Sequence, residues 1–167
     1  GFRADDIRKK YTANPFWMDI NTETDHACNL GTGGWLNRLA AGNGKDYWLD
    51  HFYVNNADNL FDLDLKHMMD QHLRDKNVVT IACTKVSDAS QYGSVAIKAG
   101  KITNFEEKKK SRKKKTGYIN GGYYIFSPKV FEYVAKLNKD VNEPLSLEND
   151  LFPLLAKEGV LGAYVSD

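Results

Sequence analysis

The sequence predicts an α/β fold in which helices pack on the faces of a mainly parallel sheet. The main observation is an aromatic and β-branched run at 47–55, followed by an amphipathic segment at 63–75 and an apolar run at 77–84. Such a strand, helix, strand succession is typical of a parallel sheet covered by helices. With 167 residues, 42% of them hydrophobic and 27% charged, the composition indicates one globular domain over 1–167.

Composition and spacing also exclude several classes of protein. No window approaches the roughly eighteen consecutive apolar residues of a membrane-spanning helix, and the first residues are too charged for a secretory signal, so we expect a cytoplasmic location. Cys28 and Cys83 lack the spacing of a disulfide framework or zinc site and are expected to be buried thiols. The histidines, none at metal-ligand spacing, are His26, His51, His67 and His72.

The first half of the chain predicts two short elements before the strand at 47–55. "RADDIRKKY" at 3–11 is typical of a helix and "FWMDI" at 16–20 of a strand, and "LGTGG" at 30–34 then interrupts the pattern. The later amphipathic segment has one apolar stripe, which we expect to face the core. This stripe consists of Leu65, Met68, Met69 and Leu73.

The second half predicts a hairpin followed by strands and capped helices. Two alternating runs flank a turn at 98–101, which indicates a β-hairpin at 94–105. After a basic run, "YINGGYYIF" at 118–126 predicts a strand, and "LGAYV" at 161–165 predicts another. Between them lie two helices. One has Ser127 as N-cap with Pro128 at its first position, and the other is capped by Ser146 and ends at Gly159.

Acidic residues follow the strand at 47–55. Ligands of α/β sheets bind beyond the carboxyl ends of the strands, and Asp58 stands directly after this one. One or two carboxylates with phosphate oxygens and waters suit Mg²⁺, so we assign Asp58 to a metal site. A capping role is more common for an isolated aspartate, and we adopt it for Asp62 and Asp64, one of which is expected to cap the following helix.

An ordered series of short segments runs through most of the chain. They are "LGTGG" at 30–34, "ADNLFDLDL" at 57–65, "QYGSV" at 91–95, "ITNFEEK" at 102–108, "INGGYYIFSPKVFEYV" at 119–134 and "SLENDLFPLLAKEGVLGAY" at 146–164. Their order and separations resemble those of the sugar-phosphate nucleotidyltransferases, or nucleoside-diphosphate-sugar pyrophosphorylases. "FEEK" without a following Pro and "INGGYYIF" are most similar to the heptose 1-phosphate guanylyltransferase branch, and the glucose 1-phosphate cytidylyltransferase branch shares "INGG".

The resemblance implies both a fold and an activity. The fold is a Rossmann-like, GT-A-like three-layer α/β/α fold with a mixed, mainly parallel sheet, incomplete at the N-terminus. The activity is Mg²⁺-dependent transfer of a nucleotidyl group from a nucleoside triphosphate to a sugar 1-phosphate, with release of pyrophosphate. The branch implies a GDP-heptose product that serves surface polysaccharide or glycan synthesis. No membrane or nucleic-acid partner is implied, and a homo-oligomer is left open.

The resemblance also implies a role for individual residues. Catalysis and metal binding would fall to Asp58, which holds Mg²⁺ against the α-phosphate, and to Lys108, which pairs with the sugar phosphate. Nucleotide binding would involve Asn29, Gly31 and Thr32 together with Asp58, and sugar binding would involve Gly93, Glu107 and Asn120 together with Lys108.

The chain departs from the family pattern at both ends. It lacks the opening Gly-rich loop that carries the triphosphate, and it stops at "YVSD", short of an aspartate that completes the family's metal site. The sequence is therefore expected to be an internal piece of such an enzyme and to be inactive alone.

Other functions remain open from the residues. The family also includes thymidylyltransferases, and "DLD" at 62–64 mimics the metal motif of GT-A glycosyltransferases. The run from Lys108 to Lys115 has seven basic residues, and it predicts either a solvated loop or a non-enzymatic module that binds nucleic acid or another anion. We favour the loop because the aromatic pattern of an RNA-binding fold is missing.

Overall fold

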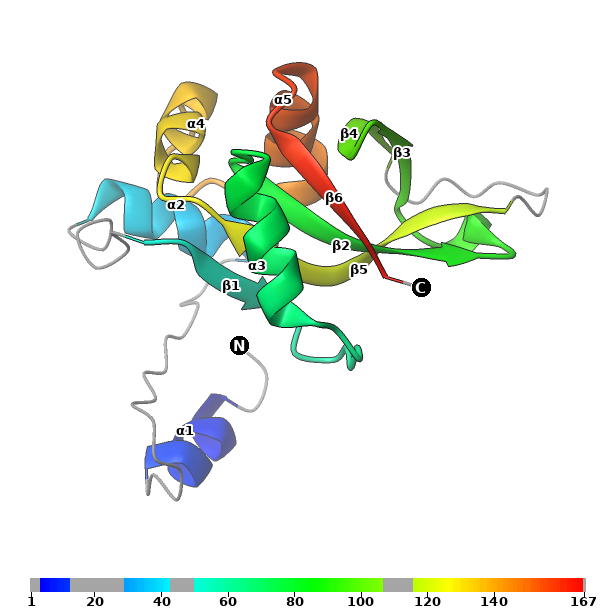
Figure 1. Ribbon diagram of the computed structural model, residues 1–167. Coiled ribbons are helices and arrows are strands. Elements are labelled where there is room, and N and C mark those ends of the chain that lie inside the picture. The colour runs from blue at the N-terminus through cyan, green and yellow to red at the C-terminus, as the bar shows by residue number, and fades with distance from the viewer. Residues whose placement is uncertain (1–3, 13–28, 43–49, 107–115, 167) are drawn as a thin grey trace.

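One curved, six-stranded sheet organises the chain. The structure is a computed structural model that describes residues 4–12, 29–42, 50–106 and 116–166. The strands follow the order β1-β5-β2-β6-β4-β3, and β3 also pairs with β5, so the far edge of the sheet turns back on itself (Figure 1). The strands are β1 Phe52–Asn55, β2 Val79–Val86, β3 Ser94–Lys98, β4 Lys101–Glu106, β5 Gly117–Phe126 and β6 Leu161–Ser166.

The mixed sheet is confirmed, but among the described strands it is not mainly parallel. Strands β2 and β6 form the parallel pair, and β5 runs antiparallel to β1 on one side and to β2 on the other. The βαβ crossover from β1 to β2 leaves a gap one strand wide, which β5 fills in the reverse direction. Strands β1, β2 and β6 still share one direction, so their carboxyl ends lie toward the same edge of the sheet.

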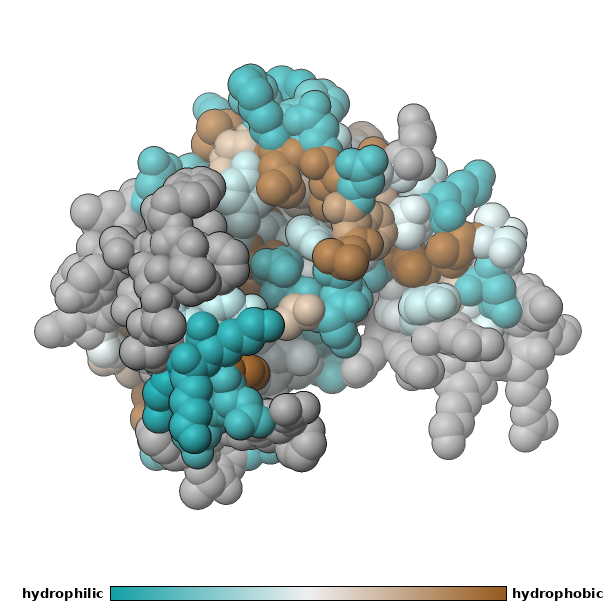
Figure 2. Space-filling model, turned by 90° about the horizontal axis from the view of Figure 1, so that it is seen from below, coloured by the Kyte–Doolittle hydropathy of each residue, from teal (hydrophilic) through white to brown (hydrophobic). Residues whose placement is uncertain are grey.

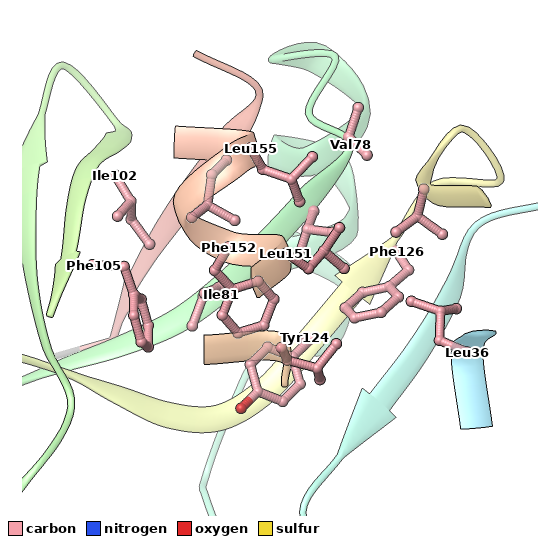
Figure 3. Packing of buried hydrophobic residues seen from close by; sticks show 14 of the residues in the cluster. Leu36, Val78, Ile81, Ile102, Phe105, Tyr124, Phe126, Leu151, Phe152 and Leu155 are labelled. Atoms are coloured by element: carbon pink, nitrogen blue, oxygen red, sulfur yellow. The ribbon is translucent and has the colours of Figure 1, made fainter. Parts of the chain in front are cut away.

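Helices cover both faces of this sheet (Figure 1). Helix α3 (Leu65–Arg74) packs on one face through Met68, against Ala82, Ile125 and Tyr164. The other face carries the larger core, drawn in Figure 3, where Leu36, Phe126 and Phe152 are fully buried. The helices on that face are α2 Gly34–Ala41, α4 Val130–Leu137 and α5 Phe152–Lys157, and the described chain begins with α1 Ala4–Thr12.

The prediction that one apolar stripe of α3 faces the core is partly wrong. Met68 is buried and Met69 half-buried, but Leu65 and Leu73 are 42% and 47% exposed. His72 takes the buried position instead, with no exposed surface. The helix is therefore rotated toward the side on which His72 finds polar partners, because a buried imidazole is tolerated only where it is hydrogen-bonded.

Some of the element ends agree with local signals in the sequence. The hairpin turn is confirmed at Ala99 and Gly100, which have φ angles of 50° and 74°. Ser146 is confirmed as a cap, because its hydroxyl accepts from Asn149 N, although the first turn, Leu147–Leu151, is π-helical before α5 begins. Helix α4 begins at Val130, later than expected, because a turn at Ser127 precedes it. The strand expected at 16–20 lies outside the described residues.

Candidate functional site

A bulge in the middle of β5 organises the candidate site. Ile81 of β2 lies opposite Tyr124 of β5, and Cys83 lies opposite Asn120. Between these pairs, three residues of β5, 121–123, lie opposite a single residue of β2, Ala82. Gly122 has a φ of 77°, a left-handed conformation that glycine adopts without strain. Bulges of this kind re-aim side chains and backbone groups next to functional sites.

The side chain of Asn120 closes this bulge. Its Oδ1 accepts from Gly122 N at 2.9 Å, and its Nδ2 donates to the Tyr124 hydroxyl, also at 2.9 Å. Its backbone N–H donates to the carbonyl of Gly93 at 3.1 Å. The structure thus brings together Asn120 and Gly93, the two described residues assigned to the sugar. One Nδ2 hydrogen and one Oδ1 lone pair of Asn120 are left over for a ligand.

Asp58 lies on an exposed turn beside the same bulge. Asn59 N donates to Asn56 O at 3.3 Å, which makes 56–59 a turn with Asp58 inside it. Asn56 N donates in turn to Gly122 O at 2.8 Å. In Figure 1 this turn follows the carboxyl end of β1. Figure 2 shows the molecule from below, where the coloured residues include both hydrophilic and hydrophobic ones. The turn that carries Asp58 is thus joined to the bulge that carries Asn120, and it follows a strand, as expected from the sequence.

The glycine loop at 30–34 is hydrogen-bonded to Leu145, in the segment that precedes α5. Gly33 N donates to Leu145 O at 2.8 Å, and a Cβ on Gly31, whose φ is 73°, would lie 2.6 Å from the same oxygen. Asn29 Oδ1 accepts from Gly31 N at 3.1 Å, which leaves its Nδ2 group for a base edge. The glycines thus allow a close approach of the loop backbone to Leu145.

Glu148 binds this loop to the start of the helical segment at 146–157, and nothing in the sequence pointed to it. Thr32 Oγ1 donates to Glu148 Oε2 at 2.5 Å and accepts from Leu147 N at 2.9 Å. The Ser146 hydroxyl donates to the same carboxylate at 3.1 Å. An acidic residue in the first turn of a helix is common for dipole reasons, so the sequence carried no signal that set Glu148 apart.

The buried Tyr124 hydroxyl lies between these parts of the site. Burial raises the pKa of Tyr124 to about 12, hydrogen bonds from the Asn120 and Asn56 side chains act in the opposite direction, and the charge of Glu148 raises it further. Figure 3 shows the hydroxyl pointing away from the apolar cluster. Tyr124 is therefore a neutral polar group that links the Glu148 side of the site to the turn that carries Asp58.

The donor set fits a magnesium ion that is shared with a phosphate. Among the described residues no three His, Cys, Asp or Glu side chains gather as a metal cluster. Asp58 is an exposed single carboxylate, and Mg²⁺ is commonly held by one or two carboxylates that are completed by phosphate oxygens and waters. Asp64 Oδ1 accepts from His67 N at 2.8 Å and caps α3, as expected. Asp58 is thus the candidate ligand.

Two assigned residues, Glu107 and Lys108, fall outside the described residues, as does the basic run to Lys115. The strand that leads to them is described: Glu106 of β4 lies opposite Ser94 of β3, the neighbour of Gly93. Cys83 is buried as expected, whereas Cys28 also lies outside the described part of the chain. No described helix is long and apolar enough to cross a membrane.

Comparison with known proteins decides the family. The family model described as "Nucleotidyl transferase" matches residues 8–166. The chain belongs to the nucleotidyl transferase family. Curated relatives of this nucleotidyl transferase chain include the "Probable glucose-1-phosphate cytidylyltransferase" of Bacillus subtilis (strain 168), 34% identical over 72% of the chain and 43% of that protein. Another is the "Mannose-1-phosphate guanylyltransferase catalytic subunit beta" of Xenopus tropicalis, 37% identical over 68% of the chain and 30% of that protein.

Solved structures agree with this membership. HddC from Yersinia pseudotuberculosis is 27% identical, with a TM-score of 0.69 over 98% of the chain and 66% of HddC. HddC complexed with GMP-PN matches with a TM-score of 0.68. The Rossmann-like α/β fold of the nucleotidyl transferases is thereby confirmed for this chain. The chain spans less than half the length of the two curated relatives.

Proposed function

We propose that this chain forms part of an enzyme that transfers a nucleotidyl group from a nucleoside triphosphate to a sugar 1-phosphate, giving a nucleoside-diphosphate sugar and pyrophosphate. The observation that carries the proposal is the meeting of the Asp58 turn, Asn120 and Gly93 on the β5 bulge, in a chain of the nucleotidyl transferase family.

The residues divide the proposed reaction between two sides of the site. On the nucleotide side, the loop of Gly31 and Thr32 would lie against the base, and Thr32 is held in place by Glu148. On the sugar side, Asn120 Nδ2 and the space beside Gly93 accommodate the sugar, with Glu107 accepting from its hydroxyls and Lys108 neutralising its phosphate.

The reaction itself needs positioning and charge stabilisation rather than a covalent intermediate. A sugar-phosphate oxygen attacks the α-phosphorus in line, and the bond to pyrophosphate breaks. Asp58 would hold Mg²⁺, which when bound offsets the negative charge on the phosphates. Lys108 would orient the attacking phosphate toward the α-phosphorus.

For the specific substrates we propose GTP and a heptose 1-phosphate, giving GDP-heptose for surface polysaccharide or glycan synthesis. The mannose-1-phosphate guanylyltransferase relatives and the complex of HddC with GMP-PN support guanine. The "FEEK" and "INGGYYIF" segments support the heptose branch. The Bacillus subtilis relative favours a second candidate, transfer of a cytidylyl group to glucose 1-phosphate.

A release assay tests both candidates. Purified protein carrying this chain is incubated with Mg²⁺, each of four nucleoside triphosphates, and mannose, glucose or heptose 1-phosphate, and pyrophosphate is measured. We expect release with GTP and heptose 1-phosphate, and the second candidate predicts CTP with glucose 1-phosphate. Failure of every pair to release pyrophosphate would sink the proposal.

Paired variants connect the assay to the site. Asp58→Asn should abolish release, because it removes the carboxylate assigned to the metal. Asp62→Asn is the matched control, since Asp62 is an exposed aspartate of the same loop and should be dispensable. The opposite pattern, with Asp62 required and Asp58 dispensable, would favour the GT-A glycosyltransferase reading of "DLD".

A further inference from the structure

The exposed turn that carries Asp58 is anchored at both of its ends. At the first end, Asn56 N donates to Gly122 O at 2.8 Å. At the second end, Asn59 Nδ2 donates to Gly121 O at 3.1 Å, and the carbonyl of Asn59 accepts from the Tyr123 hydroxyl at 2.9 Å. An exposed turn would otherwise sample many conformations, so these bonds hold the backbone on either side of Asp58 in one place.

The bulge of β5 and the anchored turn fit each other closely. A Cβ on Gly122 would lie 2.2 Å from Asn59 Nδ2, and a Cβ on Gly121 would lie 2.9 Å from Ala82 O. The Asn59 side chain thus occupies the space that a side chain on Gly122 would need. The bulge also carries Asn120, whose side chain closes it, so the position of the turn and that of the sugar-side amide depend on the same piece of backbone.

We propose that Asn59 is a positioning residue for Asp58, and that Tyr123 acts with it. The inference rests on the proposed function, in which Asp58 binds the metal. Groups that hold a ligating carboxylate strengthen metal binding, because the ligand does not have to be ordered when the ion arrives. Neither Asn59 nor Tyr123 touches the substrates in this proposal, and both act through the backbone of the turn.

Direct metal binding tests the inference without relying on turnover. Mn²⁺ is the probe, because it shares the preference of Mg²⁺ for carboxylate and water, and free Mn²⁺ is measured by electron paramagnetic resonance during titration of the protein. Asn59→Ala and Tyr123→Phe should each weaken Mn²⁺ binding roughly fivefold, the effect of losing one ordinary hydrogen bond. Tyr123→Phe keeps the ring and its packing on Phe61, so the variant should still fold.

Tyr53→Phe is the matched control. Tyr53 is also a tyrosine whose hydroxyl donates to a backbone carbonyl, that of Leu65 at 2.8 Å, but it does not hold the Asp58 turn. Its loss should leave Mn²⁺ affinity unchanged, and an equal weakening would overturn the inference.

Asp58→Asn separates this inference from the proposed function. If it abolishes Mn²⁺ binding while Asn59→Ala or Tyr123→Phe binds normally, the positioning role is wrong and the metal assignment stands. If Asp58→Asn itself binds Mn²⁺ normally, the metal assignment fails and the positioning role fails with it.

Discussion

Lowering the pH from 7 to 5 should reduce the free energy of unfolding by about 2 kcal/mol through one buried side chain, His72. His72 of α3 has no exposed surface. Its Nδ1 lies 2.7 Å from Thr80 Oγ1, and its Nε2 lies 2.8 Å from His51 Nδ1. Beyond Thr80, Asn77 Nδ2 donates to the threonine oxygen at 3.1 Å, and Lys101 Nζ donates to Asn77 Oδ1.

This network fixes the protonation state of His72. A lysine ammonium can only donate, so Asn77 accepts from Lys101 with its oxygen and donates to Thr80 with its nitrogen. The Thr80 hydroxyl is then able to donate to His72 Nδ1, which leaves a neutral ring with its proton on Nε2, facing His51. A second proton would give this buried ring a positive charge near the ammonium group of Lys101, which is unfavourable.

The magnitude follows from the shift in pKa. Burial lowers the pKa of His72 to about 4, electrostatic interactions with His51 and Lys101 lower it too, and Asp75 acts in the opposite direction. An unfolded chain restores the ordinary value of about 6.5, so below that pH the unfolded state binds more protons than the folded state. Stability is therefore complete at high pH and is lost as the pH falls from about 6.5 toward 4. The loss is about 2 kcal/mol at pH 5 and about 3 kcal/mol at its limit.

Urea denaturation at pH 7 and pH 5 measures this loss. The unaltered protein should lose about 2 kcal/mol more between the two pH values than His72→Gln, which cannot titrate there. His67→Gln is the matched control, an exposed histidine on the same helix, and its pH dependence should follow that of the unaltered protein. Equal pH dependence in the unaltered protein and His72→Gln would refute the reasoning.

Two further predictions concern the site. Gly122→Ala should lower the free energy of unfolding by roughly 2–3 kcal/mol, and Gly100→Ala by only about 1 kcal/mol. The two glycines have similar φ angles, 77° and 74°, but of the two only Gly122 has a neighbour within 4 Å of the added Cβ. Equal losses of stability in urea denaturation would contradict this prediction. Thr32→Val removes the hydroxyl bound to Glu148 and should raise KM for the nucleoside triphosphate roughly fivefold. Thr103→Val, which alters an exposed threonine of β4, is the control. A similar rise of KM in this control would argue against a specific role of the Thr32 hydroxyl.

Several elements were predictable because their signals are local. The apolar, β-branched run of β2 and the Ala99–Gly100 turn specify their conformations within a few residues, through strand propensity and backbone sterics. Ser146 caps its helix through a bond to a residue three positions away. Asp58 could be placed beside the site because it directly follows a strand.

The remaining features depend on partners that are distant in the sequence. Leu65 and Leu73 suit a buried stripe, yet His72 is buried instead, because Thr80 and His51 supply hydrogen bonds that helical periodicity cannot reveal. Glu148 is paired with Thr32, 116 residues earlier, and without that contact it is an ordinary acidic residue in a first helical turn.

Local sequence thus decides where strands, turns and caps form, since propensity and capping act over a few residues. Strand direction and the joining of site residues are decided only in the folded chain. Strand β5 runs antiparallel between β1 and β2, and its bulge connects Asn120 to Gly93 and to the Asp58 turn. These contacts depend on which strand fills the gap left by the βαβ crossover, a choice made by packing and hydrogen bonding across the whole sheet.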